Sequence, residues 1–160
     1  MRNDHPISRR TVLAAAGALP LLMSMPRRGH AEALPLVSVS KDPSCGCCDG
    51  WVAHIEAAGF PVKVVESSDM DSLKQRLGVP AELASCHTAE VEGFAIEGHV
   101  PAIAIRKLLS ERPRAGGLAV PGMPIGSPGM EGGRPEVYEV VLFGRDKPQS
   151  YGRYLGDRPA

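Results

Sequence analysis

The fold of this chain is decided by the stretch LVSVSKDPSCGCCDGW, which occupies residues 36–51. It begins with a short apolar run, typical of a buried strand, and the Lys-Asp-Pro-Ser segment then ends that strand. Cys45, Cys47 and Cys48 follow at once, and Trp51 begins an apolar face that continues at helical spacing through Ile55. The stretch therefore predicts a strand, a cysteine-bearing turn and a helix, in that order.

The rest of the chain predicts further strands and helices that alternate with these. They are a strand over residues 62–65, a helix capped by Asp69 or Asp71, a hairpin over residues 91–96, a helix beginning at Pro101, and a last strand over residues 137–143. Gly59 and Gly78 are placed to end the first and second helices. Up to the third helix the order is β-α-β-α-β-β-α, which matches an α/β domain of the thioredoxin-like type.

In a thioredoxin-like domain the cysteines would lie at the amino end of the first helix, where backbone N–H groups and the helix dipole favour a thiolate. The loop before the third strand and the start of the last helix meet at that same end. Those positions hold Cys86, His87 and His99. Thioredoxins carry a cis-proline in the loop before the third strand, and its replacement by Cys86-His87 favours metal binding over peptide substrates.

The N-terminus resembles an export signal. A twin arginine, Arg9-Arg10, precedes an apolar run over residues 12–25 that is too short to span a bilayer as a settled helix. We therefore expect residues 1–33 to be a Tat-like signal peptide, cleaved near Glu32 or Leu34, which directs the protein to the periplasm. The alternative is an uncleaved N-terminal anchor.

Removing the signal changes the charge balance. The first 31 residues hold five of the 18 basic and one of the 18 acidic residues, which leaves 13 basic and 17 acidic residues and a net charge of −4. A nucleic-acid surface needs a clustered basic face, so nucleic acid is not expected as a partner. Stable membrane insertion is not expected either once the signal has been removed. Roughly 130 residues make one domain, expected over residues 34–145, followed by a C-terminal tail over residues 146–160.

Residues 114–135 form a Gly/Pro-rich segment that repeats the tripeptide Pro-Gly-Met at residues 121–123 and 128–130. A loop of this length is usually functional or disordered. Because a strand follows it, the loop is held at both ends and can fold over the cysteines as a lid. Met123 and Met130 are then candidate metal ligands, and a flexible linker with incidental methionines is the alternative.

The clustered thiols favour copper. Thiolate and thioether donors select Cu(I), and neighbouring Cys47 and Cys48 diverge along the chain, so the cysteines suit a site with several coppers and shared sulfurs. Three alternatives remain open: structural disulfides, a redox-active Cys45–Cys48 pair without metal, and a zinc site of three cysteines and one histidine. The zinc site would leave Cys47 and both methionines without a role.

The histidines and three acidic residues are the remaining polar candidates. His99 and His87 are candidate ligands, with a histidine hydrogen-bonded to the backbone as the alternative. His54 is expected to be a solvated side chain. Three acidic residues around the hairpin are expected to form a solvated face: Glu90, Glu92 and Glu97.

Several motifs together resemble the CopG-type copper-resistance family. They are KDPSCGCCDGW at residues 41–51, LASCHTA at 83–89, IEGHVP at 96–101, GLAVPGMP at 117–124 and GSPGME at 126–131. The resemblance implies a thioredoxin-like fold, a periplasmic location and copper binding. It implies ligand roles for Cys45, Cys47, Cys48 and Cys86, and for Met123 and Met130. It also implies participation in copper homeostasis alongside other copper-handling proteins.

The function expected from the sequence is therefore a periplasmic copper(I)-binding protein that acts in copper homeostasis or resistance. No catalytic residue is required by this hypothesis. The first alternative is a thiol–disulfide oxidoreductase, with Cys45 as the exposed nucleophile and Cys48 as the resolving thiol. The second is a chaperone that delivers copper to a partner protein.

Overall fold

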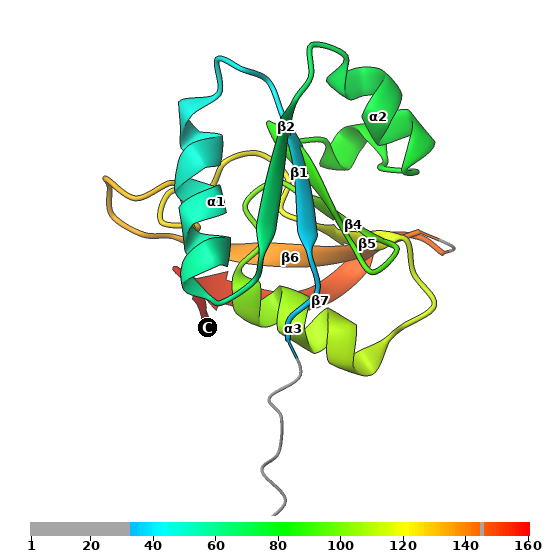
Figure 1. Cartoon of the computed structure of the whole chain (residues 1–160). Helices are drawn as coiled ribbons and strands as arrows, with labels where there is room; N and C mark the ends of the chain where they lie inside the picture. The colour runs from blue at the N-terminus through cyan, green and yellow to red at the C-terminus, as the bar shows by residue number, and fades with distance from the viewer. Residues whose placement is uncertain (1–32, 145) are drawn as a thin grey trace, which may run out of the picture. The chain divides into compact units, whose positions relative to one another are not determined.

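The computed structural model describes residues 33–144 and 146–160, which are built around a single eight-stranded sheet (Figure 1). The expected signal peptide falls on residues that lie outside the described range, apart from Ala33. Within the described residues, every helix is too short or too polar to cross a membrane.

The element order confirms the β-α-β-α-β-β-α prediction and then adds strands beyond it. The elements are β1 (Val37–Lys41), α1 (Gly46–Ala57), β2 (Val62–Glu66), α2 (Met70–Arg76), the 3₁₀ turn η1 (Ala81–Leu83), β3 (His87–Val91), β4 (Phe94–Glu97), α3 (Ala102–Glu111), β5 (Gly117–Ala119), β6 (Val137–Phe143), β7 (Gln149–Leu155) and β8 (Arg158–Pro159).

The strands lie in the order β2-β1-β3-β4-β5-β6-β7-β8. β1 pairs with β2 in parallel, as β4 does with β5, and every other neighbouring pair is antiparallel. β3 and β4 form the predicted hairpin. Its tight turn places Glu92 and Gly93 at positive φ, of 50° and 84°, which is the backbone that a two-residue hairpin turn requires.

The helix ends follow the local sequence signals. The Asp69 side chain accepts a hydrogen bond from the backbone N–H of Ser72, which selects Asp69 over Asp71 as the N-cap of α2. Gly59 follows α1 at φ +89°, where residues with a Cβ are disfavoured. Pro101 is the N-cap of α3, which begins one residue later than expected.

Apolar side chains cover both faces of the sheet. On one face Trp51 and Ile55 of α1 and Ile105 and Leu108 of α3 are fully buried in a single cluster with inward-facing strand residues. On the other face a smaller cluster contains Val79 and Leu83, from the segment after α2, and residues of β4, β5 and β6. The sheet is therefore covered by α1 and α3 on one face and by the segment after α2 on the other.

The C-terminal part contains more sheet than the sequence predicts. The segment expected as a Gly/Pro-rich loop, 114–135, contains β5, and the segment expected as a tail, 146–160, contains β7 and β8. Tyr151 of β7 donates a hydrogen bond to the carboxylate of Glu111 at 2.7 Å, and so ties the new strands to α3. The strand expected over residues 137–143 is β6.

Candidate metal centre

The cysteine turn is shaped by the residues just before it. The Asp42 carboxylate accepts hydrogen bonds from the backbone N–H and hydroxyl of Ser44, and its carbonyl accepts from the N–H of Cys45 at 3.0 Å. Cys45 becomes the N-cap of α1. The Lys41 ammonium lies 2.8 Å from a carboxylate oxygen of Asp49, which links the end of β1 to the first turn of α1.

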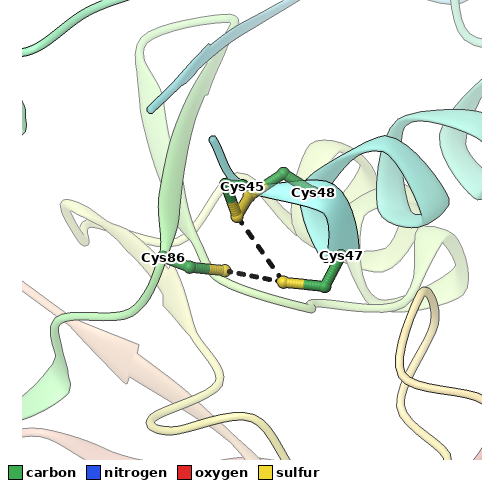
Figure 2. A group of neighbouring side chains, drawn as sticks. All are labelled: Cys45, Cys47, Cys48 and Cys86. Carbon is green, nitrogen blue, oxygen red and sulfur yellow. Dashed lines mark hydrogen bonds between the residues drawn. A yellow bond between two sulfur atoms is a disulfide. The ribbon is translucent and has the colours of Figure 1, made fainter. Parts of the chain in front are cut away.

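Four cysteine sulfurs meet at this turn (Figure 2). Cys45 and Cys48 form a disulfide, and the Cys47 sulfur lies 3.5 Å from that of Cys45 and 3.9 Å from that of Cys86. All four sulfurs lie within 4.8 Å of one another. Cys48 is fully buried whereas the other three are partly exposed, so access to the group is through Cys45, Cys47 and Cys86.

His99 is held with one nitrogen directed at this group. Its Nδ1 lies 2.8 Å from the carbonyl oxygen of Pro128, and its Nε2 lies 3.3 Å from the sulfur of Cys86. A carbonyl oxygen only accepts hydrogen bonds, so Nδ1 carries the proton and the neutral ring leaves the Nε2 lone pair free. This is how proteins commonly fix a metal-binding histidine.

His87 also lies against Cys86, with its ring 5.1 Å from that of His99 between centroids. Its Nδ1 is 3.4 Å from the Cys86 sulfur, and its ring packs on Trp51 with centroids 4.5 Å apart. The side chain is fully buried, and Nε2 has no hydrogen-bond partner among the described residues. Cys86, His87 and His99 therefore form a second group of three ligand atoms, which shares one sulfur with the first.

Burial keeps all three of these groups uncharged. It lowers the pKa of His87 to about 3, with the neighbouring His99 and Lys74 adding to the effect, and it also lowers the pKa of His99. Burial, together with the nearby Cys47 sulfur, raises the pKa of the Cys86 thiol to about 11. The imidazoles thus offer free lone pairs, whereas Cys86 must lose a proton before it binds a metal.

The second Pro-Gly-Met tripeptide folds over the cysteine turn. A Cβ added to Gly129 would lie 2.5 Å from the backbone nitrogen of Trp51 and 2.9 Å from the carbonyl oxygen of Cys47, so this backbone rests on the first turn of α1. The Pro128 carbonyl is bound to His99. Met130, which follows directly, is half-buried.

The first Pro-Gly-Met tripeptide lies beside the Cys86 loop. The hydroxyl of Ser85 donates a hydrogen bond to the carbonyl oxygen of Gly122 at 2.9 Å. Met123 is 53% exposed. Both methionines expected as ligands therefore belong to segments docked at the cysteine end, but only Met130 is partly enclosed.

Two expectations about polar residues are wrong. Glu97 does not belong to a solvated face with Glu90 and Glu92, because it is fully buried and paired with Lys74. Its position at the end of the apolar strand Phe94–Glu97 was the available signal. His54 is half-buried, and its Nε2 accepts a hydrogen bond from the N–H of Ala102 at 3.0 Å.

Comparisons with known proteins agree with this geometry. A family model described as a protein of unknown function, DUF411, matches residues 83–130, which include Cys86, His99 and both methionines. No curated protein matches the chain.

Two solved structures match most of the chain. Both are named copper resistance protein CopG, in a form 1 and a form 2, and each is 46% identical to this chain with a TM-score of 0.72. Each match covers 76% of this chain and 98% of the solved chain. With that identity over nearly the whole relative, and with the four cysteines gathered at one site, the chain belongs to the CopG family.

Proposed function

We propose that this protein binds copper(I) in the periplasm, at a site bridged by cysteine sulfurs, and acts in copper homeostasis and resistance. The observation that supports this most is the approach of four cysteine sulfurs to within 4.8 Å of one another. Thiolates prefer Cu(I) to harder metal ions. The relatives named copper resistance protein support the same choice of metal.

The donors are distributed so that more than one ion is accommodated. Cys45, Cys47, Cys48 and Cys86 would hold copper through sulfur, and Cys86 also belongs to the group that contains His87 and His99. A sulfur shared between two groups of donors is suited to bridging two ions. The thioethers of Met130 and Met123 would complete the set from the loop above.

The disulfide sets a condition on loading. Two of the four sulfurs are joined between Cys45 and Cys48, so only Cys47 and Cys86 carry free thiols. Opening the disulfide takes two electrons and two protons from a thiol reductant and gives two further thiols. Each thiol then releases its proton when it binds a metal.

The proposal is tested by measuring metal content and free thiols together. The mature protein is purified without oxygen from the periplasm of copper-fed cells, with zinc-fed cells as the control. Two or more coppers per chain, with no disulfide and little zinc uptake, is the expected result. Preferential zinc binding, or an absence of metal with the disulfide intact, would overturn it.

A thiol–disulfide oxidoreductase is the second candidate, and the exposure of the paired cysteines favours it. Cys45 is accessible at the start of α1 whereas Cys48 is fully buried, as an attacking and a resolving thiol require. Reduction of a disulfide-containing peptide by the copper-free protein would support this activity. Delivery of copper is a third role, and it predicts transfer that depends on contact with a partner protein.

We also propose a thioredoxin-like core and export through a Tat-like signal. The strand order β2-β1-β3-β4, with β3 antiparallel to β1, and the cysteines at the start of α1 support the core. The twin arginine supports the export route. If it is right, exchanging Arg9 and Arg10 for lysine leaves the precursor inside the cell, whereas exchanging Arg27 and Arg28 does not.

A further inference from the structure

A buried charged network lies directly behind the Cys86 loop. The Glu97 carboxylate is fully buried at the end of β4. One of its oxygens accepts hydrogen bonds from the Lys74 ammonium at 2.5 Å and from the backbone N–H of Ser85 at 2.6 Å. The other accepts from the hydroxyl of Thr88 at 2.6 Å, and Lys74 also donates to that hydroxyl at 2.8 Å. The network thus joins α2, the Cys86 loop, β3 and β4.

Stability alone is a poor explanation for this network. Removing two charges from water is unfavourable, and well-packed apolar side chains of similar volume often serve equally well or better. Glu92 and Arg112 form a pair of the same chemistry in an exposed position, with atoms 2.7 Å apart, at the other end of the β3–β4 hairpin. The buried pair, unlike that one, fixes the backbone of a loop.

Two of the three groups that donate to Glu97, those of Ser85 and Thr88, are adjacent in sequence to a residue of the candidate metal centre. Ser85 precedes Cys86, and Thr88 follows His87. Thr88 and Glu97 are also cross-strand partners in the β3–β4 ladder. Because neighbouring residues of a strand point to opposite faces, Thr88 faces the network while His87 faces the cysteines.

The Ser85 side chain also packs closely against the backbone of Gly98. Gly98, between Glu97 and His99, has φ +70°, and a Cβ there would lie 2.6 Å from the Ser85 hydroxyl and 2.8 Å from the carbonyl oxygen of Val120. Glu97 therefore holds the Ser85 backbone N–H, while the Ser85 side chain packs against Gly98. The Cys86 sulfur, one residue on, lies 3.9 Å from Cys47 and 3.3 Å from His99.

We infer that Glu97 is a positioning residue, with Lys74 as its counter-ion, whose bond to the Ser85 backbone N–H holds the Cys86 sulfur within reach of Cys47 and His99. Only the expected effect on copper binding rests on the proposed function. The positioning itself concerns the approach of the Cys86 and Cys47 sulfurs, which can be measured in the metal-free protein.

The first test measures that geometry without metal. In a background with Cys45→Ser and Cys48→Ser, only Cys47 and Cys86 remain, and the rate at which they form a disulfide in a glutathione redox buffer reports their approach. Adding Lys74→Met with Glu97→Leu removes both charges and the acceptor for Ser85, and should slow the reaction about tenfold or more. Adding Lys74→Met with Glu97→Gln removes the charges but keeps an acceptor oxygen, and should restore most of the rate.

The contrast between these two variants separates positioning from general stability. A purely structural role would change the melting temperature without a difference in cross-linking between the Leu and Gln substitutions. Glu92→Gln, which breaks the exposed pair, is the matched control and should leave the rate unchanged. A wild-type rate of cross-linking in a folded protein that carries Lys74→Met with Glu97→Leu would overturn the inference.

Two further measurements keep the test decisive. If the variant with Lys74→Met and Glu97→Leu does not fold, Thr88→Val takes its place, because it removes one hydrogen bond to Glu97 while keeping the ion pair. It should slow formation of the Cys47–Cys86 disulfide measurably. An unchanged rate would count against the inference. With all four cysteines present, Lys74→Met with Glu97→Leu should weaken Cu(I) binding 10- to 100-fold, the usual effect of losing a residue that orients a ligand. If even the wild-type protein binds no copper, the proposed function fails while the cross-linking result still decides the positioning role.

Discussion

Gly129 lies so close to Gly50 that a Cβ on Gly50 would stand only 2.9 Å from the Gly129 Cα atom. This contact seats the second Pro-Gly-Met tripeptide on the first turn of α1, above the cysteines. The loop and the helix are far apart in sequence, and the close approach of their backbones at Gly129 and Gly50 holds the tripeptide over the cysteines as a lid. Only glycine at both positions allows it.

Gly50→Ala should therefore displace the lid without removing any candidate ligand. We expect Cu(I) affinity to fall about tenfold, as measured by competition with a chromogenic chelator, because the added methyl group moves Met130 and the Pro128 carbonyl that orients His99. Gly46→Ala is the matched control, since a Cβ there meets nothing within 4 Å. Equal affinities for the two variants would contradict the lid.

The two methionines should differ in their effect on copper binding. Met130 is half-buried and follows Gly129, whose backbone rests on α1, whereas Met123 is 53% exposed. Met130→Leu should weaken Cu(I) binding more than Met123→Leu, and neither should change thiol–disulfide exchange by the copper-free protein. Met70→Leu, at the start of α2, controls for the loss of a thioether elsewhere. A larger effect at Met123 would reverse the assignment.

Acid should destabilise the metal-free protein through His87. Its pKa is about 3 when folded and close to 6.5 when unfolded, so the unfolded chain binds a proton that the folded protein does not as the pH falls below 6.5. The stability that the folded protein gains by keeping His87 neutral is therefore fully present above pH 6.5 and is lost progressively toward pH 3. Between pH 7 and pH 5 the free energy of unfolding should fall by about 2 kcal/mol from this residue.

The measurement is urea unfolding at pH 7, 6 and 5 for the wild-type protein and for His87→Phe, which keeps an aromatic ring against Trp51. His99 and His54, whose pKa values burial also lowers, contribute equally to both proteins. The variant should therefore show the shallower pH dependence. Parallel curves would show that His87 does not stay neutral in the folded protein.

The Cys86 thiol should react slowly at neutral pH. Burial and the nearby Cys47 sulfur raise its pKa to about 11, so only a small fraction is thiolate at pH 7. The rate of alkylation by iodoacetamide, followed at Cys86 by mass spectrometry, should rise about tenfold for each pH unit between 7 and 10. A plateau below pH 9 would mean that a positive charge or a hydrogen-bond donor stabilises the thiolate.

Local patterns predicted the fold well up to the end of α3. The apolar run before Cys45, the helix that contains Trp51 and the hairpin around Gly93 each carry a strong short-range signal, and each is present. β5 was missed because it is three residues long and begins at Gly117. β7 was missed because its sequence, QSYGRYL, is mostly polar and exposed, so no alternation of apolar residues marks it.

Long-range pairing explains what the sequence could not predict at the site. The cysteine cluster could be anticipated because three of its members lie in one turn and the fold brings Cys86 to them. The burial of Glu97 depends on Lys74, which is 23 residues away on another element, and no local pattern joins the two. The same holds for His54, whose partner Ala102 begins a helix 48 residues further on.

The candidate donors come from the cysteine turn, the start of β3, the turn before α3 and the loop before β6, which are joined only by the folded sheet. An unfolded chain carries the three cysteines of the turn without Cys86, His99 or the lid beside them. The compartment in which this chain folds is therefore the compartment in which its complete site first exists. A chain that crosses a membrane folded can carry a metal acquired on the side where it was made, whereas a chain threaded through unfolded must find its metal on arrival.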